Sequence, residues 1–256
     1  MTTERKPVLE LRGISKSYGS VRALTDVDFT AYAGEVIGLV GDNGAGKSSL
    51  IKVISGVYSP DAGQLFVDGI ERHWKSPHDS MLAGIETLYQ DSGLAPDLSI
   101  GSNIFLGREK MRKGILGSFG VIDQTAMERE ALKHLEKVGI TLVAGKRTVS
   151  QLSGGQRQAV AIGRAVAWAE HVIILDEPTN HLGARQSNEV LKVIESAREH
   201  GLCVLFISHT LPHVLQVSDR IIVLRLGKVV RDSPTTDYTV ESLLGAITGL
   251  NEASAT

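Results

Sequence analysis

Apolar and polar positions change their spacing several times along this 256-residue chain. Residues 8–11 and 27–32 alternate weakly between apolar and polar side chains, as half-buried strands do. Residues 36–40 are instead continuously apolar, which is typical of a strand buried on both faces of a parallel sheet. Two further runs of this kind, 172–175 and 202–207, come much later in the chain. The pattern therefore predicts a group of half-buried strands near the N-terminus, followed by a sheet that is buried on both faces.

Helical spacing separates these strands, with apolar residues recurring every three or four positions in the segments 47–55, 125–138, 156–169 and 188–199. Strands that alternate with helices imply a mainly parallel sheet covered on both sides. We therefore expect an α/β fold with a mainly parallel core sheet, an N-terminal antiparallel β subdomain and an inserted α-helical subdomain. The predicted boundaries assign 1–90 and 169–256 to the core and 91–168 to the helical subdomain.

Composition narrows the classes of partner. Lys plus Arg total 27 and Asp plus Glu total 29, which leaves a net charge of −2 without a block of like charge. A general nucleic-acid binder needs an excess of cations to neutralise phosphates, so we expect no nucleic-acid partner. The single cysteine, Cys203, lies in an apolar run and is expected to be a buried, inert thiol.

The chain holds no segment near the roughly 20 uninterrupted apolar residues that span a bilayer. Its first residues, MTTERKPV, also lack the apolar stretch of a secretory signal. We expect a soluble, cytoplasmic chain that reaches any membrane through a partner.

A glycine-rich motif follows the first buried strand. Residues 41–48 read GDNGAGKS, which matches GxxxxGK[ST]. The glycines let successive backbone N–H groups point at one anion, and the next helix presents its positive end to the same anion. Lys47 would reach the β- and γ-phosphates, and the Ser48 hydroxyl would bind Mg²⁺. The sequence thus predicts a P-loop NTPase core whose phosphate-binding residues are Gly41, Asn43, Gly44, Ala45, Gly46, Lys47, Ser48 and Ser49.

Two carboxylates, Asp176 and Glu177, follow the buried strand at 172–175. Ligands of open α/β sheets bind at the carboxyl ends of the strands. Asp176 is the expected Mg²⁺ residue, directly or through a water, and Glu177 the expected base for an attacking water. Alone, the pair would fit a capped turn equally well, and the phosphate motif upstream favours the catalytic interpretation.

Residues 152–156 read LSGGQ just before a predicted helix, with Ser153 suited to an N-cap and Gly154 and Gly155 suited to close approach of an anion. Together with GDNGAGKS and VIILDEP, this motif resembles the nucleotide-binding domain of ABC ATPases over essentially the whole chain. The resemblance implies ATP as the ligand, Mg²⁺ as its metal and ATP hydrolysis as the reaction.

The resemblance also implies further roles. Tyr18 is similar to the aromatic residue that stacks on adenine, Gln90 to the glutamine that contacts Mg²⁺ and the attacking water, and His209 to the histidine that contacts the γ-phosphate. In the family, the LSGGQ segment of one subunit closes over ATP held by the other, which here would be Ser153, Gly154, Gly155 and Gln156. One cassette per chain then implies a dimer, most simply a homodimer.

Finer motifs resemble the ATPases of ribose-, xylose- and fructose-type importers, among them residues 103–109, NIFLGRE, and 226–228, LGK. That branch implies transmembrane permease subunits, an external solute-binding protein and a peripheral place on the cytoplasmic face of the cell membrane. We expect residues 91–108 to receive the permease. Gly183 departs from the family, because it stands where an aspartate commonly helps to couple the two ATP sites.

Other functions stay open. An amino-acid importer or an exporter would use the same motifs, so the transported molecule cannot be read from this chain. A soluble ABC-type translation factor, suggested by Thr179-Asn180-His181-Leu182, would carry two cassettes and a charged linker. A chromosome-maintenance ATPase would need a long coiled-coil insertion, whereas Ser48 and Ser153 are 153 − 48 = 105 positions apart.

Overall fold

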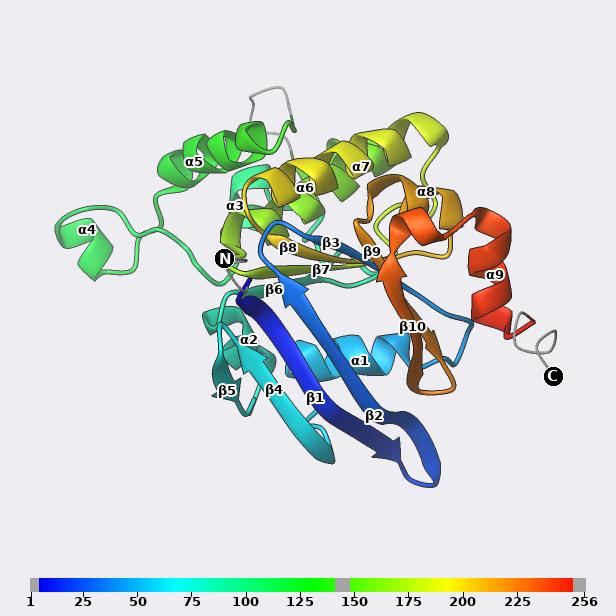
Figure 1. Ribbon diagram of the computed structural model, residues 1–256. Coiled ribbons are helices and arrows are strands. Elements are labelled where there is room, and N and C mark those ends of the chain that lie inside the picture. The colour runs from blue at the N-terminus through cyan, green and yellow to red at the C-terminus, as the bar shows by residue number, and fades with distance from the viewer. Residues whose placement is uncertain (1–4, 141–147, 251–256) are drawn as a thin grey trace.

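The computed structural model describes residues 5–140 and 148–250 and arranges them around two β-sheets (Figure 1). The larger sheet has the strand order β10-β9-β3-β8-β7-β6. Neighbouring strands are parallel from β9 to β6, and β10 is antiparallel to β9. These strands are β3 (Val36–Val40), β6 (Ile85–Leu88), β7 (Val172–Asp176), β8 (Cys203–Ile207), β9 (Arg220–Arg225) and β10 (Lys228–Pro234).

The smaller sheet is antiparallel, in the order β2-β1-β4-β5. Its strands are β1 (Pro7–Tyr18), β2 (Val21–Tyr32), β4 (Ala62–Val67) and β5 (Ile70–Arg72). Helices cover the parallel sheet, with α1 on the side of the smaller sheet and α5, α6 and α7 on the other side (Figure 1). The helices are α1 (Lys47–Ile54), α2 (Pro77–Leu82), α3 (Ile100–Ile104), α4 (Ile115–Ser118), α5 (Gln124–Lys137), α6 (Gly154–Trp168), α7 (Ala184–Glu199), α8 (Leu211–Val217) and α9 (Val240–Thr248), with short 3₁₀ turns at Val149–Gln151 and Thr235–Asp237.

The central strands are buried on both faces because their alternate side chains enter two different hydrophobic clusters. In β3, Val36 and Val40 pack with residues of α5, α6 and α7, whereas Ile37 and Leu39 pack with α1 and the smaller sheet. The continuous apolar run at 36–40 is thus explained by burial on two sides. Cys203 lies fully buried in the second cluster, and burial raises the pKa of its thiol, as expected for an inert cysteine.

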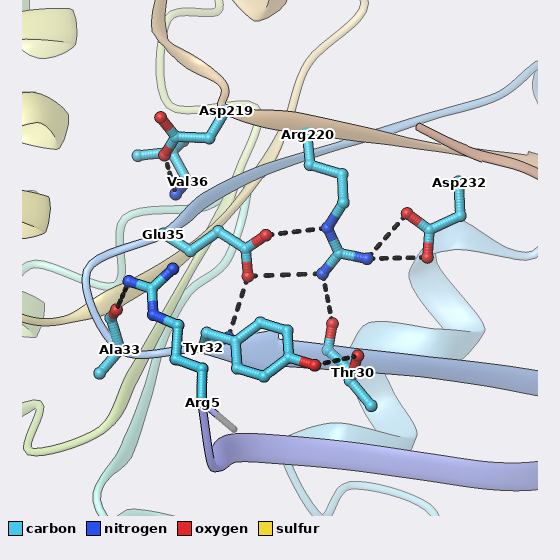
Figure 2. Close-up of polar contacts among 9 residues, drawn as sticks. All are labelled: Arg5, Thr30, Tyr32, Ala33, Glu35, Val36, Asp219, Arg220 and Asp232. Atoms are coloured by element: carbon cyan, nitrogen blue, oxygen red, sulfur yellow. Dashed lines mark hydrogen bonds and ion pairs between the residues drawn. The ribbon is translucent and has the colours of Figure 1, made fainter. Parts of the chain in front are cut away.

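The two sheets are joined by the partly buried guanidinium of Arg220 (Figure 2). Arg220 of β9 donates to Glu35 Oε1 at 2.8 Å and, through one nitrogen, to both carboxylate oxygens of Asp232 on β10 at 2.7 and 2.8 Å. Its third nitrogen donates to the carbonyl of Thr30 on β2. Glu35 in turn accepts from the backbone N–H of Tyr32 at 2.9 Å. One side chain thereby ties β2, the β2–β3 connection, β9 and β10 together.

The α/β fold with a mainly parallel sheet is confirmed. The predicted strands at 36–40, 172–175 and 202–207 are β3, β7 and β8, each within one residue of the prediction, and the helices at 125–138 and 156–169 are α5 and α6 within two. The described residues of 91–168 share one hydrophobic cluster with the parallel sheet. Their division from the core therefore stays a prediction. Within the described ranges, no helix has the length and apolarity that a bilayer crossing requires.

We predict that Arg220→Met destabilises the fold by about 3 kcal/mol, because removal of one partner leaves Glu35 buried without its counter-charge. Equilibrium unfolding in urea near neutral pH measures the change. The matched control is Arg198→Met, which breaks a half-exposed ion pair to Asp219 at 3.1 Å and should cost at most about 1 kcal/mol. Equal losses in the two variants would contradict the joining role of Arg220.

Candidate active site

Parallel pairing brings four loops to one edge of the larger sheet, since the strands that precede them all end there. The glycine-rich turn follows β3, Gln90 follows β6, the acid pair ends β7, and His209 follows β8. Residues from two of these loops, after β6 and at the end of β7, line a common hollow of about 670 Å³, together with residues from α1, α6 and the turn after β7. Its lining consists of Ser48, Lys52, Tyr89, Gln90, Asp91, Gln158, Asp176, Glu177, Asn180 and His181.

The glycine-rich turn has a shape that side chains would block. Gly44 and Gly46 have φ angles of +80° and +108°, in the left-handed region that favours glycine. A Cβ at Gly46 would also lie 2.6 Å from the carbonyl oxygen of Ala23. The turn is closed by a hydrogen bond from the N–H of Ala45 to the carbonyl of Asp42 at 3.1 Å.

Lys47 is held inside this turn. Its ammonium donates to the carbonyl oxygens of Gly41 and Asp42 at 2.7 and 3.0 Å, and its side chain is buried. Burial lowers the pKa of Lys47, and the nearby carboxylates of Glu177 and Asp176 oppose that shift. The ammonium is therefore a buried donor at the start of α1, the helix end that carries partial positive charge.

The acid pair is largely withdrawn from solvent. Burial raises the pKa of both Asp176 and Glu177 above their ordinary values, and the positive charges of Lys47 and His209 partly offset this. Glu177 has a φ of +54°, an uncommon conformation for a residue with a side chain, and its N–H donates to the carbonyl of Ile207 at 3.0 Å. Strained backbone held by a neighbouring strand is a feature of functional sites.

His209 contacts the acid pair directly. Its Nε2 lies 3.1 Å from Glu177 Oε1, with the Glu177 side chain 10% exposed and the His209 ring 54% exposed. The histidine is thus the more exposed partner of the pair, and it does not line the hollow. Glu177 Oε1 is buried and accepts no hydrogen bond from the described residues, so the contact brings the imidazole close to the carboxylate without a hydrogen bond between them.

Ser48, Gln90 and Asp176 offer only oxygen ligands for a metal, a hydroxyl, an amide and a carboxylate that line the same hollow. The described residues contain no group of three or more His, Cys, Asp or Glu side chains placed to hold an ion. Such a sparse oxygen set fits Mg²⁺, which keeps several waters and needs few protein ligands.

Two predicted groups lie apart from this hollow. Tyr18 ends β1, is partly exposed and packs edge-to-face on Tyr58, with ring centroids 5.3 Å apart. Ser153 caps α6 and accepts from the N–H of Gln156 at 3.3 Å, while the Gln156 amide oxygen accepts from the Ser153 N–H at 3.0 Å. The side chains at both ends of this capping box are exposed, so the motif faces outward from its own chain.

Gly155 of the same motif is buried against α7, where a Cβ would lie 2.6 Å from Gln186 Cγ. Gln186 also accepts a hydrogen bond from the N–H of Gly183 at 2.8 Å. Gly183, which departs from the expected aspartate, is therefore the N-cap of α7 and shares a neighbour with LSGGQ.

Sequence patterns did not point to Tyr58, Lys52 or Gln158 as neighbours of the site. Tyr58 follows α1 in a turn, and no local signal marks its contact with Tyr18. Lys52 and Gln158 reach the hollow because they lie one helical turn beyond Ser48 and near the start of α6. Helical spacing from Ser48 is the one signal that would have found Lys52.

Comparisons with known proteins agree with this geometry. Residues 24–180 match the family model described as ABC transporter. The chain is 44% identical to the fructose import ATP-binding protein FrcA of Rhizobium meliloti, over 97% of this chain and 96% of that protein. It is 42% identical to the xylose/arabinose import ATP-binding protein XylG of Sulfolobus acidocaldarius, over 94% of each chain. It spans only 48% of the fructose import ATP-binding protein FruK of Bifidobacterium longum, at 37% identity.

Solved structures of ATP-binding cassettes are similar to this chain over most of their length. A nucleotide-free ATP-binding cassette from an ABC transporter has a TM-score of 0.79 at 24% identity, covering 93% of this chain and 95% of that one. A dimeric cassette in a post-hydrolysis state, bound to ADP and Pi, has a TM-score of 0.73 at 25% identity, covering 89% and 98%. With the phosphate turn and acid pair on one sheet edge, these matches establish that the chain belongs to the ABC transporter family, as an ATP-hydrolysing cassette.

Proposed function

We propose that this chain is the ATPase subunit of an ABC importer for a pentose or hexose sugar, acting as a homodimer. In this proposal it binds transmembrane permease subunits at the cytoplasmic face of the membrane, and an external solute-binding protein delivers the sugar. The observation that carries the catalytic part is the convergence of the phosphate turn, the acid pair and His209 at one sheet edge. The sugar branch rests on relatives that are named for fructose and xylose/arabinose import.

The phosphate turn binds the substrate in this mechanism. The N–H groups of residues 41–48 and of the first turn of α1 donate to the phosphate oxygens of ATP. Lys47, whose ammonium contacts the carbonyls of Gly41 and Asp42, exchanges part of that contact for the β- and γ-phosphates. Asn43 lies within this turn and Ser49 in the first turn of α1, and Tyr18, at the end of β1, would stack on the adenine.

Mg²⁺ would be held by Ser48, Gln90 and Asp176, and it would supply charge neutralisation to the phosphates when bound. Burial raises the pKa of Asp176, and the charges of Lys47 and His209 oppose that rise. A second positive charge in the hollow would favour the ionised carboxylate. Gln90, at the end of β6, also connects the hollow to the surface at residues 91–108 that we propose for the permease.

Hydrolysis proceeds by in-line attack of water on the γ-phosphate. The water oxygen forms a bond to phosphorus while the bond to the bridging oxygen breaks, and ADP carries away that electron pair. Glu177 accepts the proton from the water, for which a raised pKa is favourable because it increases the basicity of the carboxylate. His209, whose Nε2 lies 3.1 Å from Glu177 Oε1, would donate to the γ-phosphate.

The second half of the site comes from another copy in this proposal. Ser153, Gly154 and Gln156 face outward from their own chain, so the partner's copy of this segment can close over the phosphates from the opposite side. A two-fold dimer then encloses two ATP molecules. The dimeric cassette with ADP and Pi supports this arrangement. Hydrolysis removes the shared phosphate contacts and opens the dimer.

A panel experiment tests the sugar assignment. The chain is co-purified with its native permease, and ATP hydrolysis is measured with solute-binding proteins loaded with fructose, xylose, ribose or amino acids. Stimulation by one of the sugars supports the proposal. Stimulation by an amino acid and by none of the sugars would replace it with an amino-acid importer, and movement of solute outward would make the complex an exporter.

We predict that Glu177→Gln lowers the rate of ATP hydrolysis by about 100-fold or more, because the amide cannot accept the proton. ATP binding should be retained, and the variant should accumulate as a dimer with ATP in size-exclusion chromatography. Glu170→Gln, an exposed position just before the other end of β7, is the matched control and should hydrolyse ATP at the wild-type rate. Wild-type turnover in Glu177→Gln would exclude Glu177 as the base.

We predict that Lys47→Ala weakens ATP binding itself, by about 10-fold or more, because a buried charge-assisted contact to the phosphates is lost. Fluorescence titration with a labelled nucleotide measures the affinity. Lys192→Ala, which removes an exposed charge on α7 outside the hollow, is the control and is expected to bind normally. Unchanged affinity in Lys47→Ala would remove this lysine from the phosphate site.

We predict that Ser153→Trp abolishes hydrolysis but leaves nucleotide binding to the monomer intact. The matched control is Thr239→Trp, because Thr239 caps α9 in the same manner, accepting from the N–H of Ser242 at 3.2 Å. Each variant loses the stability that an N-cap gives its helix, about 1 kcal/mol. The two variants therefore differ mainly in which part of the molecule carries the new tryptophan. If Ser153→Trp lost monomer binding instead, the site would not be completed by a second chain.

A further inference from the structure

Residues 110–122, which precede Asp123 at the N-cap of α5, form an arm that projects from the helical side of the molecule and ends in α4 (Figure 1). Its two sides are held together at the base. The N–H of Arg112 donates to the carbonyl of Val121 at 2.8 Å, the N–H of Asp123 donates to the carbonyl of Lys110 at 2.7 Å, and Met111 pairs with Ile122 as an antiparallel bridge. The arm is therefore a hairpin whose two sides are hydrogen-bonded at the base.

The tip of the arm is also specifically packed. Gly114 and Gly120, which flank α4, both have a φ of +75°. Gly117 packs against the carbonyl oxygen of Arg112, and a Cβ at position 117 would collide with that oxygen. Glycine at three positions thus allows a four-residue helix to fold back on the neck of the hairpin.

Large apolar side chains of this arm point into solvent. Ile115 and Phe119 are 78% and 81% exposed, and their spacing of four residues puts them on one side of α4. Met111 and Ile122, 50% and 40% exposed, are directly opposite each other and so share one face of the neck. Exposed apolar residues gathered in one place mark an interaction site.

The charge of the arm has one sign. Residues 110–122 include Lys110, Arg112 and Lys113 and no acidic residue, in a chain whose net charge is −2. Lys110 is paired with Glu130 of α5. Among the described residues, no carboxylate pairs with Arg112 or Lys113, both of which are exposed. Two cations therefore stand beside the apolar tip.

We propose that this arm rests on an anionic lipid surface, with the apolar side chains of Ile115 and Phe119 at the headgroup boundary and Arg112 and Lys113 on lipid phosphates. Apolar residues flanked by cations on a small projecting element are the composition of interfacial membrane anchors. The arm offers a narrow tip and no carboxylate, which suits a fluid anionic surface better than a shaped protein pocket. The inference rests on the proposed function, which brings the chain to a membrane.

The test is co-sedimentation of the full chain with vesicles of equal parts phosphatidylglycerol and phosphatidylcholine, compared with vesicles of phosphatidylcholine alone. We expect binding to the anionic vesicles that weakens as salt is raised. Arg112→Glu/Lys113→Glu should lower the bound fraction on the order of tenfold or more, since each cation near an anionic surface contributes about a fivefold change in partition. Ile115→Ser/Phe119→Ser should lose binding to the same vesicles.

Matched controls are Ile70→Ser, which removes an exposed apolar residue at the β4–β5 turn, and Lys192→Glu, which reverses an exposed charge on α7. Both should bind vesicles like the unchanged chain. Absence of vesicle binding, or equal binding by the arm variants, overturns the proposal. Loss of permease co-purification in the arm variants, without vesicle binding by the unchanged chain, would assign the arm to a protein partner instead.

ATP hydrolysis in solution is measured for every variant and should not change, because the arm lies outside the hollow and the phosphate turn. This measurement separates the two proposals. A chain that binds anionic vesicles but does not hydrolyse ATP would contradict the proposed function and leave the lipid contact standing. A chain that hydrolyses ATP but binds neither kind of vesicle would contradict the lipid contact and leave the proposed function standing.

Discussion

Parallel pairing of β3 with β8, and of β8 with β7, is the constraint on which the rest of the molecule depends. Parallel strands end at the same edge, so a turn after one strand must face the turn after the next. The phosphate motif ends at Ser48, 176 − 48 = 128 positions before Asp176, and His209 follows Glu177 by 209 − 177 = 32 positions. This pairing alone makes the three segments neighbours. Burial of the strands on both faces then keeps the edge from shifting, because any slip would displace side chains from two hydrophobic clusters at once.

The partly buried guanidinium of Arg220 extends this constraint to the smaller sheet. Tyr18 belongs to that sheet, whereas Lys47 follows β3, so the distance between the proposed adenine platform and the phosphate turn depends on how the sheets are joined. A charged joint has a cost of desolvation, but its several hydrogen bonds fix one geometry where apolar packing would allow several. The joint therefore contributes to the spacing of the site as well as to stability.

Sequence reasoning located the strongly periodic and strongly patterned parts of the molecule. The strand at 36–40 was readable because burial on two sides leaves it continuously apolar, and Asp176 was readable because it ends such a strand. Short or mixed strands such as β5 and β10 gave no signal, since half of their residues face solvent. The left-handed backbone of Glu177 and the packing of Tyr18 on Tyr58 arise from tertiary contacts, which no local pattern encodes.

Gln186 has a consequence for how events at one nucleotide reach another. It touches Gly155 of the LSGGQ segment and holds the N–H of Gly183, which lies six residues after Glu177. The turn after the acid pair and the outward-facing segment therefore share one side chain as a neighbour within a single chain. Gly183 makes its part of this contact through the backbone N–H, so the contact needs no side chain at position 183.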